Sequence, residues 1–274
     1  MRKINYKLIV SDFDGTLIDD NQKIPQKVRK TISEYVECGG VFAVCTGRML
    51  CSILPRVREL GLKGLVIAQQ GGVIADIESG RIIKCETIDC NSTAEICKEI
   101  ENLGFHVNIY CGDDIYTSIP ENNEYLKIYE RIIGVKTKSV KGAVSDFVSE
   151  NGLSCEKVAC LVSESDRVYL YDALSKKLGK KFDVTCSAKV LVEVSPLTVT
   201  KGNALKYLCN QLKIPVSSSV ACGDNLNDLS MIRAAGVGVA VGNATQELKT
   251  EADFIAVTNN SGAIAQIIEK YGFA

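Results

Sequence analysis

The apolar run Leu8–Val10 leads almost directly into the hexapeptide Asp12–Leu17, and this transition limits the folds open to the chain. Alternate residues of a strand point to the same side, so Asp12 and Asp14 share one face while Phe13 turns into the core. The glycine that follows permits a sharp backbone turn. Two carboxylates at the end of a buried strand repel each other unless a cation lies between them. The alternative interpretation, a strand followed by an Asp-Gly turn, needs only one aspartate and no threonine.

The composition is that of a globular protein. The chain has 274 residues, of which 46% are hydrophobic and 24% are charged, and its formal net charge is −1. The near-zero charge argues against nucleic acid or an anionic membrane as a partner. No apolar run reaches the roughly 18 residues that a membrane span needs, and the first residues do not resemble a signal peptide. We therefore expect a cytoplasmic protein. We also expect a monomer or a weak homo-oligomer.

The cysteines and the single histidine form no pattern typical of a metal site or a disulfide framework. Twelve cysteines are present, but no Cys-x-x-Cys occurs, and zinc or iron–sulfur sites need thiolates at short spacings. Most of them fall in expected strands or on apolar helix faces, where cysteine acts as a small hydrophobic residue. His106 has no cysteine or second histidine at ligand spacing. We expect these residues to have structural rather than chemical roles.

Expected strands and helices alternate along the chain, which predicts an α/β fold with a Rossmann-like, doubly wound parallel sheet. Besides the first strand, functionally important strands are expected at residues 41–45, 65–68 and 219–222. The pattern restarts between residues 85 and 186 as an α/β unit of its own. We therefore expect a core domain of residues 1–84 and 187–274 and an inserted domain of residues 85–186. Within the insertion, residues 134–151 are polar and weakly periodic, which predicts a loop-rich connection.

Three further polar motifs lie where open α/β sheets bind their ligands, beyond the ends of strands. Thr46–Arg48 offers a hydroxyl group and turn amides for phosphate oxygens, although a helix cap would use the same residue types. Lys201-Gly202 opens an expected helix, a place where a lysine is often a surface residue. Gly223–Asp228 follows an expected strand and holds more polar residues than an ordinary cap needs.

Together the four motifs supply the groups that phosphoryl transfer from a monoester requires. Asp12 is a candidate nucleophile that could form an aspartyl-phosphate, and Asp14 is a candidate general acid and base. Asp12 and Asp224 offer the hard oxygen ligands that Mg²⁺ prefers. The groups expected to bind the phosphoryl oxygens are Thr46, the turn at Gly47, Lys201 and Asn227.

The ordered set of motifs resembles the haloacid dehalogenase-like superfamily, specifically the Cof-type phosphatases with a large α/β cap. The segments that carry the resemblance are Asp12–Leu17, Thr46–Arg48, Lys201-Gly202, Gly223–Met231 and Gly236–Ala244. The resemblance implies that Asp12 is the nucleophile and Asp14 the general acid and base. It also implies a metal held by the Asp12 carboxylate, the Asp14 backbone carbonyl and Asp224, with Asp228 supporting these ligands. The insertion at residues 85–186 corresponds to the cap.

One stretch departs from the family pattern. Gln70-Gly71-Gly72 stands where Asn-Gly-Ala is usual, and the usual asparagine lies near the substrate. The glutamine keeps an amide on a longer arm. We therefore expect the phosphate chemistry to be retained and the contacts with the leaving group to differ.

The leading hypothesis is a Mg²⁺-dependent phosphatase for a small phosphorylated metabolite, such as a sugar phosphate, a nucleotide or a phosphorylated cofactor. A phosphomutase of the same superfamily is one alternative, but it needs a second phosphate site. The acidic inserted domain offers only Arg131 and Arg167 as arginines for such a site. A sugar-phosphate-binding module without turnover is the other alternative, and the presence of both Asp12 and Asp14 argues against it.

Overall fold

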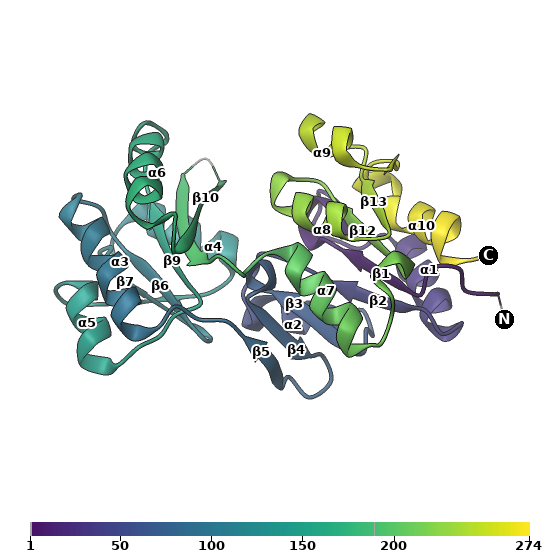
Figure 1. Ribbon diagram of the computed structural model, residues 1–274, viewed down its shortest axis with the longest axis horizontal. Helices are drawn as coiled ribbons and strands as arrows, with labels where there is room; N and C mark the ends of the chain where they lie inside the picture. The colour runs from purple at the N-terminus through teal and green to yellow at the C-terminus, as the bar shows by residue number, and fades with distance from the viewer. Residues whose placement is uncertain (1, 189) are drawn as a thin grey trace. The chain divides into compact units, whose positions relative to one another are not determined.

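The computed structural model describes residues 2–188 and 190–274, which form two compact units (Figure 1). The first unit comprises the chain up to Lys84 together with Thr200–Ala274, and the second is Cys85–Val199. Each unit contains a sheet with helices packed against it, so the chain has the α/β fold that its sequence predicts. The domain boundaries expected from the sequence at 85 and 186 stay a prediction.

A five-stranded parallel sheet forms the centre of the first unit, in the order β14-β13-β12-β1-β2. Its strands are β1 (Leu8–Ser11), β2 (Val41–Val44), β12 (Ser219–Gly223), β13 (Val237–Ala240) and β14 (Phe254–Ile255). β1 and β12 are buried along their whole length, as strands of a parallel sheet covered on both faces must be. The chain leaves β1 for β2 on one side and returns as β12 on the other. The carboxyl ends of these three strands therefore meet where open α/β sheets bind ligands.

The helices of the first unit bury their apolar faces in one hydrophobic core with this sheet. They are α1 (Gln26–Glu37), α2 (Leu50–Glu59), α7 (Lys201–Gln211), α8 (Leu229–Ala234), α9 (Gln246–Glu251) and α10 (Ala263–Ile267). The start of α7 is set by Thr200, whose side chain accepts a hydrogen bond from the backbone N–H of Asn203. This cap makes Lys201 the first residue of the helix.

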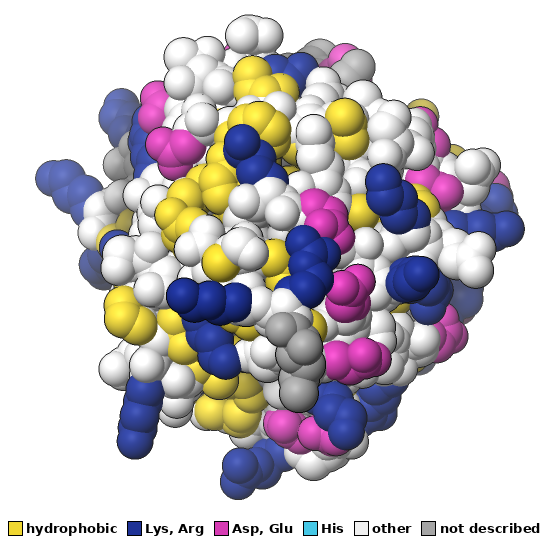
Figure 2. All heavy atoms as spheres, turned by 90° about the vertical axis from the view of Figure 1, so that its right-hand side faces the viewer, with side chains coloured by type: hydrophobic (Ala, Val, Ile, Leu, Met, Phe, Trp, Pro, Cys, Tyr) yellow, Lys and Arg dark blue, Asp and Glu magenta, His cyan; other side chains and the backbone are white. Residues whose placement is uncertain are grey.

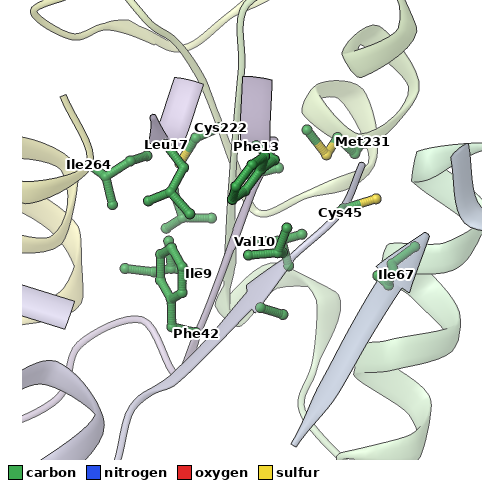
Figure 3. Close-up of a cluster of buried hydrophobic side chains, with 14 of the residues drawn as sticks. Ile9, Val10, Phe13, Leu17, Phe42, Cys45, Ile67, Cys222, Met231 and Ile264 are labelled. Carbon is green, nitrogen blue, oxygen red and sulfur yellow. The ribbon is translucent and has the colours of Figure 1, made fainter. Parts of the chain in front are cut away.

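The hexapeptide after β1 contributes to the core of the first unit (Figure 3). Strand pairing ends at Ser11, but Asp12 keeps an extended backbone, with φ −60° and ψ 161°. Phe13 and Leu17 point into the cluster of buried side chains that also contains Val10, and each is 1% exposed. The buried Phe13 therefore anchors the two aspartates that flank it.

A small three-stranded sheet, ordered β3-β4-β5, adjoins the end of β2. Its strands are β3 (Leu65–Ala68), β4 (Val73–Asp76) and β5 (Ile82–Cys85), and β3 pairs antiparallel with β4. A parallel bridge between Cys45 and Ile67 connects β3 to the chain just after β2. The short turn after β3 is thereby brought next to the loop that follows β2.

The second unit has a six-stranded mixed sheet in the order β10-β11-β9-β6-β7-β8. The strands are β6 (Asn108–Cys111), β7 (Asp114–Thr117), β8 (Thr137–Ser139), β9 (Lys157–Leu161), β10 (Phe182–Ala188) and β11 (Leu191–Pro196). The helices are α3 (Cys90–Asn102), α4 (Glu124–Ile133), α5 (Val144–Asn151) and α6 (Glu164–Leu178). Side chains from α3, α5 and α6 share a second hydrophobic core with this sheet.

The prediction of a loop-rich connection at residues 134–151 is wrong. This stretch contains the edge strand β8 and the helix α5, which buries Val144 and Val148 in the core of the second unit. Two apolar side chains four residues apart suffice for one short amphipathic helix, and polar residues on its other face mask the period. The second unit also continues to Val199, because β11 pairs with β9 and with β10.

Charged side chains are mixed on the face of the molecule that Figure 2 shows, where Asp and Glu lie among scattered Lys and Arg. This mixture agrees with the formal net charge of −1. In the described parts of the chain, no helix combines the length and the hydropathy needed to cross a membrane.

Candidate active site

The sharp turn after Asp12 and Asp14 brings the first strand next to the loop after β12. Gly15 has φ +75°, and a Cβ atom on it would lie 2.8 Å from Oδ2 of Asp224. A side chain at this position would therefore be strained and would displace that carboxylate. Thr16, one residue on, donates a hydrogen bond from Oγ1 to Oδ1 of Asp224 over 2.8 Å. The Gly-Thr pair of the hexapeptide thus serves to seat Asp224 beside the first strand.

Lys201 connects two carboxylates inside the protein. Its Nζ atom lies 2.5 Å from Oδ1 of Asp12 and 2.6 Å from Oδ1 of Asp228, and the residue is only 1% exposed. The alternative of a surface lysine is therefore wrong, although the residue does open a helix. A buried ammonium group needs such partners, because an unpaired buried charge is very costly.

Asp228 organises the loop after β12. Its Oδ2 atom accepts hydrogen bonds from the backbone N–H of Asp224 over 2.9 Å and of Asn225 over 3.1 Å. Because Oδ1 binds Lys201, both oxygens of Asp228 are already engaged by the protein. A Cβ atom on Gly223 would lie 2.4 Å from the Cβ of Asp228, so the loop closes tightly on this side chain. Asp228 is thus placed to support the neighbouring groups.

The carboxylates of Asp12, Asp224 and Asp228 carry more negative charge than the site neutralises. Burial raises the pKa of Asp12 well above its ordinary value, and the neighbouring carboxylates add to the rise. Burial likewise raises the pKa of Asp224 to about 6. Lys201 stays protonated, because Asp12 and Asp228 raise its pKa despite the opposite effect of burial. One lysine shared by several acidic groups leaves the ionised site short of positive charge.

These residues fit a divalent metal ion. Oxygen atoms of Asp12, Asp224 and Asp228 lie within 4.8 Å of one another. With Lys201 charged, the three ionised carboxylates leave two negative charges uncompensated, which equals the charge of one divalent cation. Carboxylate oxygens are the ligands of hard cations such as Mg²⁺. Since both oxygens of Asp228 are engaged, Asp12 and Asp224 are the side chains free to hold the ion.

Asp14 has a partner that our sequence reasoning missed. Arg48 donates from Nε to Oδ2 over 2.7 Å and from Nη2 to Oδ1 over 2.6 Å, a two-pronged ion pair. The hydrogen bond to Asp14 raises the pKa of Arg48 further above its ordinary value. Arg48 belongs to the motif Thr46–Arg48 that the sequence analysis singled out. However, Arg48 follows β2 and Asp14 follows β1, and nothing in the local sequence indicates that these two residues pair.

Thr46 and Gly47 lie at the end of β2, next to the turn that follows β3. Thr46 is 1% exposed, and its Oγ1 accepts a hydrogen bond from the backbone N–H of Arg48 over 3.2 Å. It does not cap the next helix, since α2 begins after Met49 and that cap has no side-chain hydrogen bond. The helix-cap alternative is therefore wrong. The threonine instead shapes a tight loop beside the buried aspartates.

Asn227 contacts Gln70 rather than the cluster around Lys201. Its Nδ2 atom donates a hydrogen bond to Oε1 of Gln70 over 3.1 Å. A Cβ atom on Gly47 would lie 2.5 Å from Nε2 of the same glutamine, so the amide of Gln70 covers that glycine. The structure thus brings Asp12, Lys201, Asp224 and Asp228 together and places Asn227 and Gly47 on either side of Gln70.

Comparison with known proteins gives a consistent result. The sequence profile of the haloacid dehalogenase-like hydrolases matches residues 9–268. The chain is similar to the phosphatase YwpJ of Bacillus subtilis, with 31% identity over 96% of this chain and 99% of that protein. It is also similar to the 5-amino-6-(5-phospho-D-ribitylamino)uracil phosphatase YwtE of B. subtilis, with 27% identity over 96% and 97% of the two chains.

Solved structures share the fold over nearly the whole chain. A haloacid dehalogenase-like hydrolase from Bacteroides thetaiotaomicron has a TM-score of 0.85, with 26% identity over 97% of this chain and 99% of that chain. The structure of TM0651 from Thermotoga maritima also has a TM-score of 0.85, with 29% identity over 98% of each chain.

Proposed function

Because the chain belongs to the haloacid dehalogenase-like hydrolase family and is a phosphatase of that family, we propose that it hydrolyses small phosphomonoesters with Mg²⁺ through an aspartyl-phosphate on Asp12. The observation that carries this proposal is the buried Lys201, bonded to Asp12 and Asp228 at the carboxyl ends of adjacent strands. Such a site holds one carboxylate in a fixed orientation and attracts a cation that can neutralise an incoming phosphate.

Asp12 is the nucleophile in this proposal. Lys201 holds the carboxylate through Oδ1. One carboxylate oxygen attacks phosphorus, and the bond from phosphorus to the ester oxygen breaks as the new bond forms. In the second step a water molecule attacks phosphorus, and the aspartyl oxygen leaves as the carboxylate. Inorganic phosphate departs, and the enzyme returns to its first state.

Asp14 moves the protons. It gives a proton to the leaving alkoxide in the first step and takes one from the attacking water in the second. Both of its oxygens accept a hydrogen bond from Arg48 in the structure, and each keeps a second lone pair on which a proton can be carried. Arg48 therefore orients the carboxylate, and its contacts set how readily Asp14 turns toward the substrate.

Mg²⁺, when bound, would neutralise charge on the phosphoryl group and on the attacking carboxylate. The residues proposed to hold it are Asp12 and Asp224 through their carboxylates and Asp14 through its backbone carbonyl. Asp228 supports them by fixing the loop of Asp224 through two backbone hydrogen bonds. Its carboxylate also orients Lys201.

The remaining site residues are proposed to bind the phosphoryl oxygens. Thr46 supplies a hydroxyl group and Gly47 a backbone N–H at the end of β2. Lys201 and Asn227 supply donors from the other side, the first as a charge and the second as an amide.

The leaving group is proposed to be selected by the second unit, which corresponds to the cap expected at residues 85–186. YwtE acts on a ribitylaminouracil phosphate by its name, and this chain shares 27% identity with it. A sugar phosphate, a nucleotide or a phosphorylated cofactor is the proposed substrate class. A cytoplasmic location and a monomeric or weakly oligomeric state remain our expectations.

A panel of phosphomonoesters assayed with Mg²⁺ tests the proposal. We expect phosphate release from several small esters, with no release by an Asp12→Asn variant purified in the same way. Transfer of the phosphoryl group to a second sugar phosphate instead of water would indicate a phosphomutase. Tight binding of a sugar phosphate without any turnover would indicate a binding module.

A further inference from the structure

The turn after β3 has an unusual backbone. Three consecutive residues have positive φ: Gln69 at 49°, Gln70 at 58° and Gly71 at 107°. Only the glycine adopts such a conformation without cost, since a Cβ atom clashes with the neighbouring carbonyl. Strained residues of this kind persist where the surrounding structure enforces them, and they cluster at functional sites.

Two loops of the active site enforce this turn. The backbone N–H of Gln69 donates to the carbonyl of Arg48, and that of Gln70 donates to the carbonyl of Thr46, each over 2.9 Å. A Cβ atom on Gly71 would lie 2.6 Å from the carbonyl oxygen of Thr200, directly before α7. The turn is therefore fixed between the Thr46–Arg48 loop and the start of the helix that carries Lys201.

The side chain of Gln70 connects two segments that the proposed function assigns to phosphate binding. Its Oε1 accepts the hydrogen bond from Nδ2 of Asn227, in the loop after β12. Its Nε2 lies against Gly47, in the loop after β2, where a Cβ atom would be only 2.5 Å away. The strained turn thus holds one amide between these two loops.

We propose that Gln70 is a positioning residue for Asn227, an inference that rests on the proposed role of Asn227 in binding the phosphoryl group. The side chain of Asn227 is exposed and would otherwise rotate freely. An asparagine amide has two N–H donors, and the bond to Gln70 uses one of them. The other is then held in a fixed direction for a phosphate oxygen, so less freedom is lost when the substrate binds.

This role explains the departure from the family pattern at residue 70. An asparagine there would be shorter by one methylene group, about 1.5 Å of reach along the side chain. It could not cover Gly47 and also meet Asn227 at hydrogen-bond distance. The longer side chain of glutamine therefore orients a group that binds the phosphate, in addition to any contact with the leaving group.

A double-mutant cycle separates this role from a structural one. Gln70→Ala, Asn227→Ala and the double variant are compared with the wild type for kcat/KM on p-nitrophenyl phosphate and for competitive inhibition by inorganic phosphate. Alanine keeps a Cβ atom, so the backbone strain at residue 70 is retained. Gln211→Ala, an exposed glutamine at the end of α7, is the matched control.

We expect Gln70→Ala to lower kcat/KM and the phosphate affinity by about 2- to 10-fold, the effect of one neutral hydrogen bond. In the Asn227→Ala background, the same substitution should cause no further loss. Gln70→Asn should behave as Gln70→Ala. Equal losses in both backgrounds, or no loss in the Gln70→Ala single variant, would overturn the proposal, because a positioning residue acts only through its target.

A wrong proposed function and a wrong positioning role for Gln70 give different results. If the wild type releases no phosphate from any ester, the proposed function is wrong, and the cycle is measured on the affinity for inorganic phosphate by calorimetry. Coupling between the two substitutions in that affinity still supports the positioning role. Additive losses, or no phosphate binding by the wild type, contradict it.

Discussion

The Nζ atom of Lys201 lies 2.5 Å from Oδ1 of Asp12, and both residues are buried. The two residues are 189 positions apart in the sequence. Asp12 follows β1, and Lys201 opens α7, the helix that precedes β12, the neighbour of β1 in the sheet. Their pairing holds the proposed nucleophile in place while the rest of the site keeps an excess of negative charge.

Replacing Lys201 should destabilise the protein strongly. In Lys201→Met, Asp12 and Asp228 lose their shared cation and remain buried, and breaking a buried ion pair typically costs about 3–5 kcal/mol. Denaturant unfolding at pH 7.5 without metal measures this cost. The control is Lys206→Met, an exposed position on the same helix. A loss of less than about 1 kcal/mol in the free energy of unfolding of Lys201→Met would show that Lys201 does not neutralise Asp12 and Asp228 in the folded protein.

Asp12→Asn should abolish turnover and leave the fold intact. The amide is no nucleophile, so we expect a loss of about 10⁴-fold or more in kcat. Burial disfavours the ionised form of Asp12, as its raised pKa indicates, so the neutral amide should leave the metal-free stability at neutral pH unchanged or higher. Thermal unfolding checks this expectation. Normal phosphatase activity in this variant would remove Asp12 from the mechanism.

Asp14→Asn should slow the reaction by an amount that depends on the leaving group. Loss of a general acid and base typically costs about 10²–10⁴-fold for an alkyl ester such as a sugar phosphate. A nitrophenyl ester should lose less, because its leaving group hardly needs a proton. The measurement is kcat/KM for both substrates in wild type and variant. Equal losses for the two esters would contradict the acid role.

Activity should require Mg²⁺, and Ca²⁺ should inhibit it. Ca²⁺ takes 6–8 oxygen ligands at about 2.3–2.6 Å and could bind both oxygens of Asp12, which would block attack. The rate is measured after EDTA treatment, then with each metal added back. Full activity in the treated protein would exclude the proposed metal role.

Mg²⁺ affinity should depend on pH through Asp224. Burial raises the pKa of this carboxyl to about 6 from 3.8, so below about pH 6 a proton competes with the metal. Affinity should fall by up to about tenfold per pH unit there. The same raised pKa predicts a change in stability without metal. Between pH 3.8 and about pH 6 the folded protein keeps a proton on Asp224 that the unfolded chain has lost, so the free energy of unfolding should fall as the pH rises through this range. Calorimetric titration between pH 5 and pH 8 checks the affinity, and a constant affinity would contradict the assignment.

The sequence predicted the elements that carry the site better than those of the second unit. The strands that lead into the site are easy to predict, because an apolar run such as Leu8–Val10 must be buried. Three of the four motifs follow such strands, and the fourth opens a helix. The strands β7 and β8 were missed because they have only four and three residues and are partly polar, and their pairing partners supply the stability that composition does not show.

Side-chain partnerships within the site could not be predicted from spacing. The ion pair between Asp14 and Arg48 joins residues that follow different strands, and the bond between Gln70 and Asn227 joins residues far apart in the chain. Such contacts depend on strand order and on backbone turns with positive φ. A single sequence contains the residue types but does not indicate which of them meet.

The most direct test of the account is to trap the phosphorylated enzyme. The Asp14→Asn variant should form the aspartyl-phosphate from p-nitrophenyl phosphate and hydrolyse it slowly, because the second step lacks its base. After rapid acid quenching and digestion, mass spectrometry should find one phosphoryl group on the peptide that contains Asp12, and none when Asp12→Asn is added. A phosphoryl group on another residue, or turnover of this substrate without any trapped phosphoryl group, would contradict the central claim.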